Sequence, residues 1–320
     1  MKQQHIMIKK FSLTRLHVGL RAIFKQQPTL RKRFSFTPYL FLAPALLVIA
    51  VFIFYPIVAV VYYSFTDYTI VTPPVWVGLR NYQQLLQDDV FWQALKNSFI
   101  YLLVTPILIF LGIVLAIVVN RKLPGINAFR ALYYIPVISG SIAVGISWRL
   151  MLDTNGLLNS LFLSLNLVTE PIQWLAEPRY SLPIAMLLTT WLGLGYYMMV
   201  FLAGLQNIPE ELYDAAMIDG CNAWQKHWNV SLPGLRPQIT FVAVISSLAA
   251  LEVFNEVFVL YGPGGGILNS AVTMVFYLWR QAFRLHHAGM ASAIAMVLLV
   301  ITLVFSIVNI RTLEHGTEEG

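Results

Sequence analysis

The sequence predicts an all-α, polytopic membrane protein with six transmembrane helices. Of its 320 residues, 58% are hydrophobic and only 11% are charged, whereas soluble domains carry roughly 25% charged residues. Its apolar runs exceed about 18 residues, which suits membrane-spanning helices and not the short alternating strands of a barrel. The single cysteine, Cys221, excludes an internal disulfide. A soluble fold could not bury this much apolar surface.

The transmembrane domain is expected over residues 37–313, with a short C-terminal tail at 314–320. The first three spans contain prolines, which are tolerated where neighbouring helices satisfy the carbonyls that they free. Each expected span is near the twenty residues that a bilayer requires. The six segments are 38–63, 97–119, 130–151, 182–205, 238–261 and 287–310.

The N-terminal segment, residues 1–36, contains nine lysines or arginines and no acidic residue. Apolar residues at helical spacing would let it form a basic helix on the membrane surface. A disordered cytoplasmic tail would explain the same composition, so both interpretations stay open. A cleaved signal peptide is not expected, because the apolar run that follows is too long.

The distribution of lysine and arginine predicts that both termini are cytoplasmic. With the N-terminus inside, the inner segments hold fifteen of the 21 basic residues and the outer segments hold the other six. Cytoplasmic loops of membrane proteins carry such an excess. The same clustering beside the spans explains the net charge of +6 without nucleic acid as a partner. The polar loop 207–237, between spans four and five, is then cytoplasmic as well.

Loop 207–237 is predicted to hold two short helices. Pro209 suits the first turn of a helix, and the acidic pair Glu210-Glu211 favours its positive N-terminus. The pair Ala215-Ala216 would leave a shallow face, and Gly220 would end the helix as a C-cap. A second helix is expected over 223–230, ending before a Leu-Pro pair. The helix pair is either a docking surface for another chain or a plain connector.

No motif of an enzyme or of a metal site stands out. The sequence contains no Walker A pattern, no His-Glu-x-x-His and no Gly-x-Ser-x-Gly. Its one histidine cluster, His286-His287, makes a poor metal pair, because adjacent residues point in different directions on a helix. We therefore expect no catalytic residue, no metal and no bound cofactor. Transport driven by ATP would need a separate ATPase chain.

Three polar residues of span five are candidates for a translocation path. Glu252, Asn255 and Glu256 have the spacings i, i+3 and i+4, which share one face of a helix. Acidic residues within a span are functional candidates because each costs about 2.5–3.5 kcal/mol on insertion scales. The shared face would line a polar cavity, suited to hydroxyl-rich ligands. A polar helix–helix contact or a position near the membrane interface is the alternative explanation for these residues.

Span four combines glycines and aromatic residues. Gly193 and Gly195 stand beside Trp191 and the pair Tyr196-Tyr197. Glycines let a flat ring approach the backbone, and tyrosines can stack on sugar rings. Close packing between helices explains each glycine as well.

Several motifs of the cytoplasmic loop resemble the EAA loop of binding-protein-dependent ABC importer permeases. They are Asp214-Ala215-Ala216, Asp219-Gly220, Leu232-Pro233 and Pro237. The resemblance implies a type I ABC importer permease fold, with a cytoplasmic coupling helix that docks in a groove of an ATPase chain. Asp214 stands where the family usually has glutamate, so the charge is kept. The coupling role would fall to Glu211, Asp214, Ala215, Ala216, Asp219, Gly220, Leu232 and Pro233.

Motifs elsewhere resemble the carbohydrate branch of this family, in particular the smaller relatives of the maltose permease. They are Leu42-Ala43-Pro44 with Tyr55-Pro56, Ser64 to Asp67, Gly78 to Tyr82, Gly264 to Ser270 and Ala288 to Ala293. Ile267 departs from the proline that is usual in the glycine-rich turn. In the maltose permease, positions matching Leu192, Gly193, Tyr196, Glu252 and Asn255 contact the sugar. Glu252 departs from the residue found there, so the identity of the sugar does not carry over.

The resemblance implies a permease subunit of a carbohydrate importer in a bacterial inner membrane. Its implied partners are a second related permease subunit, two cytoplasmic ATPase subunits that use ATP and magnesium, and an extracytoplasmic sugar-binding protein. The alternative is a self-sufficient secondary transporter or channel, with Glu252 and Glu256 as proton or cation sites. The lack of an inverted repeat argues against that alternative. Copurification with an ATPase chain would distinguish the two alternatives, because a secondary transporter needs no ATPase. A membrane-embedded enzyme is a more distant alternative, since no nucleophile–base pair is visible.

Overall fold

The computed structural model describes residues 37–121 and 124–318, and the basic segment 1–36 lies outside the described residues. The chain divides into two compact units, residues 1–56 and 57–320, and each is described by itself. Within the described ranges, the secondary structure is helical apart from one short two-stranded sheet and an isolated β-bridge between Thr69 and His287. The predicted all-α class is confirmed.

The first span is helical from Leu40 to Ser64. It consists of α2 (Thr37–Ile49), a π-helical turn (Ala50–Phe54) and α3 (Tyr55–Ser64). The wide turn directly precedes Pro56, which cannot donate a backbone hydrogen bond. The Tyr55 N–H reaches back five residues to the Ala50 carbonyl. The chain therefore passes this proline without ending the helix.

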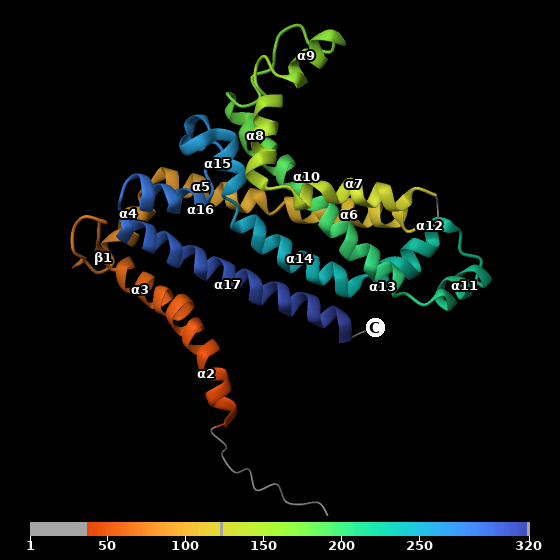
Figure 1. Ribbon diagram of the computed structural model, residues 1–320, viewed down its shortest axis with the longest axis horizontal. Coiled ribbons are helices and arrows are strands. Elements are labelled where there is room, and N and C mark those ends of the chain that lie inside the picture. Colours follow the sequence, from red (N-terminus) through yellow and green to blue (C-terminus); the bar gives the residue numbers. More distant parts are fainter. Residues whose placement is uncertain (1–36, 122–123, 319–320) are drawn as a thin grey trace, which may run out of the picture. The chain divides into compact units, whose positions relative to one another are not determined.

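Residues 57–320 form a helical bundle with short elements at both of its ends (Figure 1). After the first span come β1 (Thr66–Asp67), β2 (Val75–Trp76) and α4 (Arg80–Leu86). The helices of the bundle are α5 (Asp89–Tyr101), α6 (Val104–Val119), α7 (Ile126–Ile138), α8 (Ser141–Met151), α10 (Pro178–Gln206), α14 (Arg236–Leu251) and α17 (Ala288–Glu318). The shorter elements are α9 (Leu157–Ser164), α11 (Glu210–Ile218), α12 (Ala223–Lys226), η2 (His227–Ser231), α13 (Leu232–Gly234), α15 (Asn255–Tyr261), η3 (Gly262–Gly264), η4 (Ile267–Asn269), α16 (Met274–Trp279) and η5 (Arg280–Arg284).

Four helical stretches among the described residues are long and apolar enough to cross a membrane. They are Leu40–Ser64, Asp89–Val119, Pro178–Gln206 and Ala288–Asn309. Two bent pairs pass the same test: α7 with α8, bent by 96°, and the segment from Ala223 to Gly234 with α14, bent by 65°. Counting each bent pair as one span gives six candidate spans, the number that the sequence predicts. The second pair covers 223–251, whereas the fifth span was expected over 238–261.

The fifth expected span, 238–261, is not one continuous helix, so that prediction is wrong. α14 ends at Leu251, and α15 begins only at Asn255. Between them, the Thr273 hydroxyl donates a hydrogen bond of 2.7 Å to the Val253 carbonyl. A side chain from a distant part of the chain thus satisfies a carbonyl that the break leaves without a helical partner.

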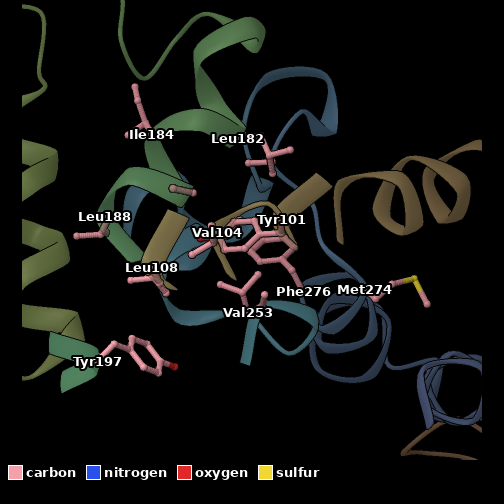
Figure 2. Close-up of a cluster of buried hydrophobic side chains, with 14 of the residues drawn as sticks. Tyr101, Val104, Leu108, Leu182, Ile184, Leu188, Tyr197, Val253, Met274 and Phe276 are labelled. Carbon is pink, nitrogen blue, oxygen red and sulfur yellow. The ribbon is translucent and has the colours of Figure 1, made fainter. Parts of the chain in front are cut away.

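Four long helices of the bundle pack side by side. α6 contacts both α10 and α14, and α14 also contacts α17 (Figure 1). Figure 2 shows a central part of the core, where Tyr101 and Val104 meet side chains of α10, α16 and the α14–α15 break. The Tyr101 hydroxyl, deep in this core, lies 2.6 Å from the Thr189 hydroxyl. Burial of apolar side chains, at about 25 cal/mol per Å², is the main force that holds the helices together.

At the end of the bundle that carries β1 and β2, the Asn81 side chain links α4 to the end of the first span. Its side-chain amide donates to the carbonyls of Ser64 and Thr66, each at 2.9 Å. The Gly289 N–H donates to the Tyr68 carbonyl at 2.9 Å, and a β-carbon on Gly289 would overlap the Thr66 carbonyl oxygen. The segments that resemble family motifs at 64–67, 78–82 and 288–293 therefore form one structural clamp.

The loop helices lie at the opposite end of the bundle from this clamp. α10 leads into α11, and α13 leads into α14, so the loop 207–237 connects neighbouring helix ends (Figure 1). α15 and α16 follow the other end of α14. If loop 207–237 is cytoplasmic, the clamp and α16 face outward. α17 also runs on to Glu318, into the segment expected as a C-terminal tail.

Candidate functional site: a capped loop and a bundle cavity

α11 begins at Glu210, directly after Pro209. Pro209 itself has an extended backbone, with φ −57° and ψ 136°, and occupies the N-cap position just before the first helical turn. Glu210 and Glu211 lie in the first turn, where the helix dipole favours negative charge. The predicted helix start is therefore found within one residue.

α11 ends in a Schellman motif around Gly220. The Cys221 N–H donates to the Ala216 carbonyl at 2.9 Å, and the Gly220 N–H donates to the Met217 carbonyl at 3.0 Å. Gly220 has a φ of +83°, which favours glycine because a β-carbon is strained there. The predicted C-cap role of Gly220 is thus present in the structure.

A capping box starts the second helix of the loop. The Asn222 side chain accepts from the Gln225 N–H at 2.9 Å, and the Gln225 side chain accepts from the Asn222 N–H at 2.8 Å. The helix then continues through a π-helical turn to Gly234. The expectation that it ends before Leu232-Pro233 is wrong, because the wide turn before Pro233 accommodates the missing N–H of the proline.

Ser231 holds the two loop helices together. Its hydroxyl is fully buried and lies 3.0 Å from the Tyr213 hydroxyl and 3.1 Å from His227 Nδ1. Tyr213 belongs to α11, whereas Ser231 and His227 belong to the π-helical turn. A single small hydroxyl therefore joins the two halves of the loop.

The exposed face of α11 combines acidic and apolar side chains. Glu211, Asp214, Ala215 and Asp219 are exposed, whereas Ala216 is 8% exposed and packs inward. The expected shallow surface of two alanines is therefore wrong in part, because adjacent residues lie about 100° apart around a helix. Apolar exposure comes instead from Met217 and Ile218, at 51% and 87%.

A second site is a cavity of about 450 Å³ inside the bundle. Four of the six residues predicted for a substrate path line it: Leu192, Gly193, Tyr196 and Glu256. Its polar lining also includes hydroxyls that the sequence argument did not assign to a substrate path, from Ser139, Ser141, Thr189 and Ser246. The volume is in the range of small-molecule pockets, about 300–1,000 Å³.

Glu252 and Asn255 do not line this cavity. Both are exposed, and the helix break separates them, so the three polar residues do not share one helical face as predicted. Glu252 is the C-cap residue that follows α14, with φ −98° and ψ 10°, and Asn255 begins α15. Only Glu256 reaches the cavity, from the first turn of α15.

The two glycines of span four have different surroundings. A β-carbon on Gly195 would overlap the Tyr133 carbonyl oxygen and come within 3.2 Å of Tyr134 Cα, so α7 leaves no room for it. A β-carbon on Gly193 would meet only side-chain atoms, with Tyr197 Cε2 at 3.2 Å. Gly195 therefore serves helix packing, whereas Gly193 opens onto the cavity.

His286 and His287 lie between η5 and α17, not on a helix as the sequence argument assumed. His286 has a φ of +60°, and His287 Nδ1 lies 3.3 Å from Gln281 Oε1. Among the described residues, no group of three or more His, Cys, Asp or Glu side chains could hold a metal ion.

Comparison with known proteins decides the family. Residues 93–311 match the family model described as the binding-protein-dependent transport system inner membrane component. The chain belongs to this family. The matched segment includes the bundle cavity and the whole of loop 207–237.

Relatives match over nearly the full length of the chain. The arabinooligosaccharides transport system permease AraP of Bacillus subtilis is 37% identical and the match covers 88% of this chain and 90% of AraP. The lactose transport system permease LacF of Rhizobium radiobacter is 32% identical, with 87% and 94% covered. A solved bacterial ABC transporter involved in the import of alginate has a TM-score of 0.78 at 23% identity, covering 88% of this chain and 96% of that chain.

This binding-protein-dependent permease is thus a transporter subunit of the inner membrane and not an enzyme. The type I importer fold implied by the sequence resemblance is confirmed. Family membership favours an ABC importer over a self-sufficient secondary transporter or channel.

Sequence reasoning missed two features of the permease's sites. The Asn222 capping box has a sequence signal, an Asn followed three residues later by Gln. The cavity hydroxyls of Ser139 and Ser141 have none, because the 96° bend between α7 and α8 brings them to the cavity. Small polar residues in a span are too common to mark such a bend by themselves.

Proposed function

We propose that this permease forms half of the translocation path of an ATP-driven carbohydrate importer. The observation that carries the proposal is the nature of its relatives: AraP and LacF, aligned over about nine-tenths of the chain, are named for sugars. A relative from Streptomyces coelicolor at 30% identity is likewise named for diacetylchitobiose. The sugar would be carried between this chain and a second, related permease subunit.

The bundle cavity is the proposed sugar site within the span. Leu192, Gly193, Tyr196 and Glu256 supply an apolar wall, an open backbone, an aromatic ring and an acceptor of hydroxyl protons. Hydroxyl groups around them would provide further donors and acceptors. Glu252 and Asn255 remain assigned to the path by the sequence resemblance alone.

Loop 207–237 is the proposed coupling element. Its capped helix α11 would dock in a groove of a cytoplasmic ATPase, so that closure of two ATPase subunits on ATP and magnesium moves the bundle. Charge, exposure and the Schellman end support this assignment. The proposed coupling residues are Glu211, Asp214, Ala215, Ala216, Asp219, Gly220, Leu232 and Pro233.

The proposed orientation places both termini in the cytoplasm, with the transmembrane domain over 37–313. An extracytoplasmic binding protein would then deliver the sugar to the face that carries the Asn81 clamp. The excess of lysine and arginine in the inner segments supports this orientation. Cysteine accessibility at position 315 and at exposed Gln83 would test it, since the two should react from opposite sides.

The test of the carbohydrate assignment is ATPase stimulation of the reconstituted complex. The complex, in liposomes with its binding protein, is exposed to lactose, maltose, arabinotriose and chitobiose, with amino acids and peptides as the comparison set. At least one sugar should stimulate ATP hydrolysis, and the comparison set should not. Stimulation by an amino acid or a peptide alone would refute the assignment.

Two variants test where the sugar binds. Tyr196→Ala should change the preference among the sugars, because the ring lines the cavity. Asn255→Ala is the matched comparison, since Asn255 is exposed and lies outside that cavity. An effect of Asn255→Ala with none for Tyr196→Ala would mean that the sugar path passes Asn255 and lies outside the cavity.

A further inference from the structure

A second cavity of about 440 Å³ lies at the far ends of α8 and α15. Its lining includes Ala176, just before the start of α10, whereas loop 207–237 follows the other end of that helix. α8 and α15 pack directly against each other (Figure 1). The polar residues Arg149, Asp153, Thr154 and Gln173 line the cavity, together with Tyr261 and the glycine-rich turn. None of these residues belongs to the bundle cavity.

The same two helices carry residues that line both the outer cavity and the bundle cavity. Ser141 and Glu256, near the starts of α8 and α15, line the bundle cavity, whereas Arg149 and Tyr261 line the outer one. At 1.5 Å rise per residue, the two linings are about 12 Å apart along α8 and about 7.5 Å apart along α15. This spacing is on the order of one or two sugar rings.

Tight packing separates the two cavities. A β-carbon on Gly145 in α8 would come 2.6 Å from Val259 Cγ1 in α15, so the two helices meet at van der Waals distance. Gly145 is buried and Val259 is 9% exposed. The outer cavity is therefore a separate site and not an extension of the bundle cavity.

The side chains of the outer cavity leave hydrogen-bonding groups open. Among the described residues, no side chain forms an ion pair or hydrogen bond with the Arg149 guanidinium. Asp153 accepts one turn N–H, from Asn155 at 3.1 Å, through Oδ1. The Thr154 hydroxyl donates to Gln173 Oε1 at 3.1 Å, which leaves the amide N–H groups of Gln173 for other acceptors. A guanidinium, a carboxylate and an amide thus line one cavity, and each has hydrogen-bond donors or acceptors that no other described side chain uses.

The aromatic wall is fixed in position. The Tyr261 hydroxyl donates to the Ser181 carbonyl at 2.8 Å, so the ring is held from its polar end. Gly264 and Gly266 line the cavity beside it and keep the backbone accessible. A fixed ring beside charged hydrogen-bonding groups matches the chemistry of a saccharide, whose hydroxyls pair with the charges and whose C–H face stacks on the ring.

We propose that this cavity is an outer saccharide-binding site, which holds the sugar before it reaches the bundle cavity. The inference rests on the proposed carbohydrate function. A neutral oligosaccharide would place adjacent hydroxyls on Arg149 and Asp153 and one ring on Tyr261. The permease would then bind sugar at two positions along α8 and α15. Docking of a loop of the binding protein into the same cavity is the competing outcome of the test.

The test counts sugar sites on the assembled complex in nanodiscs, without binding protein. Radiolabelled lactose, maltose and arabinotriose are the probes, measured by equilibrium dialysis. Arg149→Gln and, as a second variant, Asp153→Asn should each weaken one class of site at least about tenfold, as expected when a charged hydrogen bond is lost. Tyr196→Ala should weaken the other class. Arg179→Gln, an exposed arginine that does not line this cavity, is the matched control and should bind as the wild type does.

The outcomes separate this inference from the function on which it rests. Wild-type sugar binding in both Arg149→Gln and Asp153→Asn, with binding lost in Tyr196→Ala, overturns the outer site and leaves the carbohydrate function standing. Binding of no probe to the wild type, together with no stimulation of ATP hydrolysis, refutes both. A loss of affinity for the binding protein with sugar binding unchanged would assign the cavity to protein docking and overturn the inference.

Discussion

The contrast between Gly195 and Gly193 allows a quantitative test of how α10 packs. In Gly195→Ala, the new methyl group would collide with backbone atoms of α7, namely the Tyr133 carbonyl and Tyr134 Cα. Backbone atoms of a packed helix cannot rotate away as a side chain does, so α7 and α10 must separate. Overpacking of this kind costs roughly 1–3 kcal/mol. The variant complex should therefore be markedly less stable.

Gly193→Ala is the matched control on the same helix. Its methyl group would lie 3.2 Å from Tyr197 Cε2 and 3.6 Å from Leu108 Cδ2, contacts that small side-chain shifts can relieve. Removal of a helical glycine also favours the helix by up to about 1 kcal/mol. The Gly193→Ala complex should be as stable as the wild type, with its change confined to sugar transport.

The assay is thermal unfolding of the detergent-solubilised complex, followed by size-exclusion chromatography with fluorescence detection, alongside uptake in liposomes. Gly195→Ala should lower the unfolding temperature and the amount of assembled complex, whereas Gly193→Ala should alter uptake at an unchanged unfolding temperature. Equal stability of the two variants would refute the assignment of Gly195 to packing.

Three further predictions concern the loop and the clamp. Gly220→Val should abolish uptake while the protein stays in the membrane, because φ +83° strains a β-branched residue at the end of α11; normal uptake in this variant would contradict the coupling role of this helix end. Asn81→Ala should destabilise the complex by about 1–3 kcal/mol in thermal unfolding, since two carbonyls lose their donor, whereas Gln83→Ala at an exposed position should have no effect. Ser231→Ala should lower sugar-stimulated ATP hydrolysis without loss of assembly, because α11 loses its tie to the π-helical turn; unchanged stimulation would contradict a positioning role.

The sequence was sufficient for the helical class, the approximate spans and the loop helix. Long apolar runs and the signals at Pro209 and Gly220 depend only on residues that are neighbours in the sequence, so they indicate helices without knowledge of the packing. The end of α14 could not be predicted, because no glycine or proline marks Glu252 to Phe254. At the break, the Val253 carbonyl accepts its hydrogen bond from the Thr273 hydroxyl, 20 residues further on. The three polar residues of span five were consequently assigned to one face when only Glu256 reaches the cavity.

The two glycines of span four illustrate a second limit of sequence reasoning. Gly193 and Gly195 are separated by one residue and read identically as small residues in an apolar helix. Their roles differ because α7 passes over one of them and the cavity opens beside the other. Which neighbour a helical position meets is a property of the packed bundle and not of the spacing.

The Asn81 clamp has a consequence for biogenesis. Tyr68 and Gly289, which share a backbone hydrogen bond at the clamp, are made far apart in time. At roughly 5–20 residues per second, about 10–45 s of synthesis separate them. This hydrogen bond can form only after the start of the last span has been made, so the clamp is among the last contacts to form. A chain stalled before Gly289 emerges from the ribosome would lack this hydrogen bond, and the end of its bundle that carries β1 and β2 would remain unclamped.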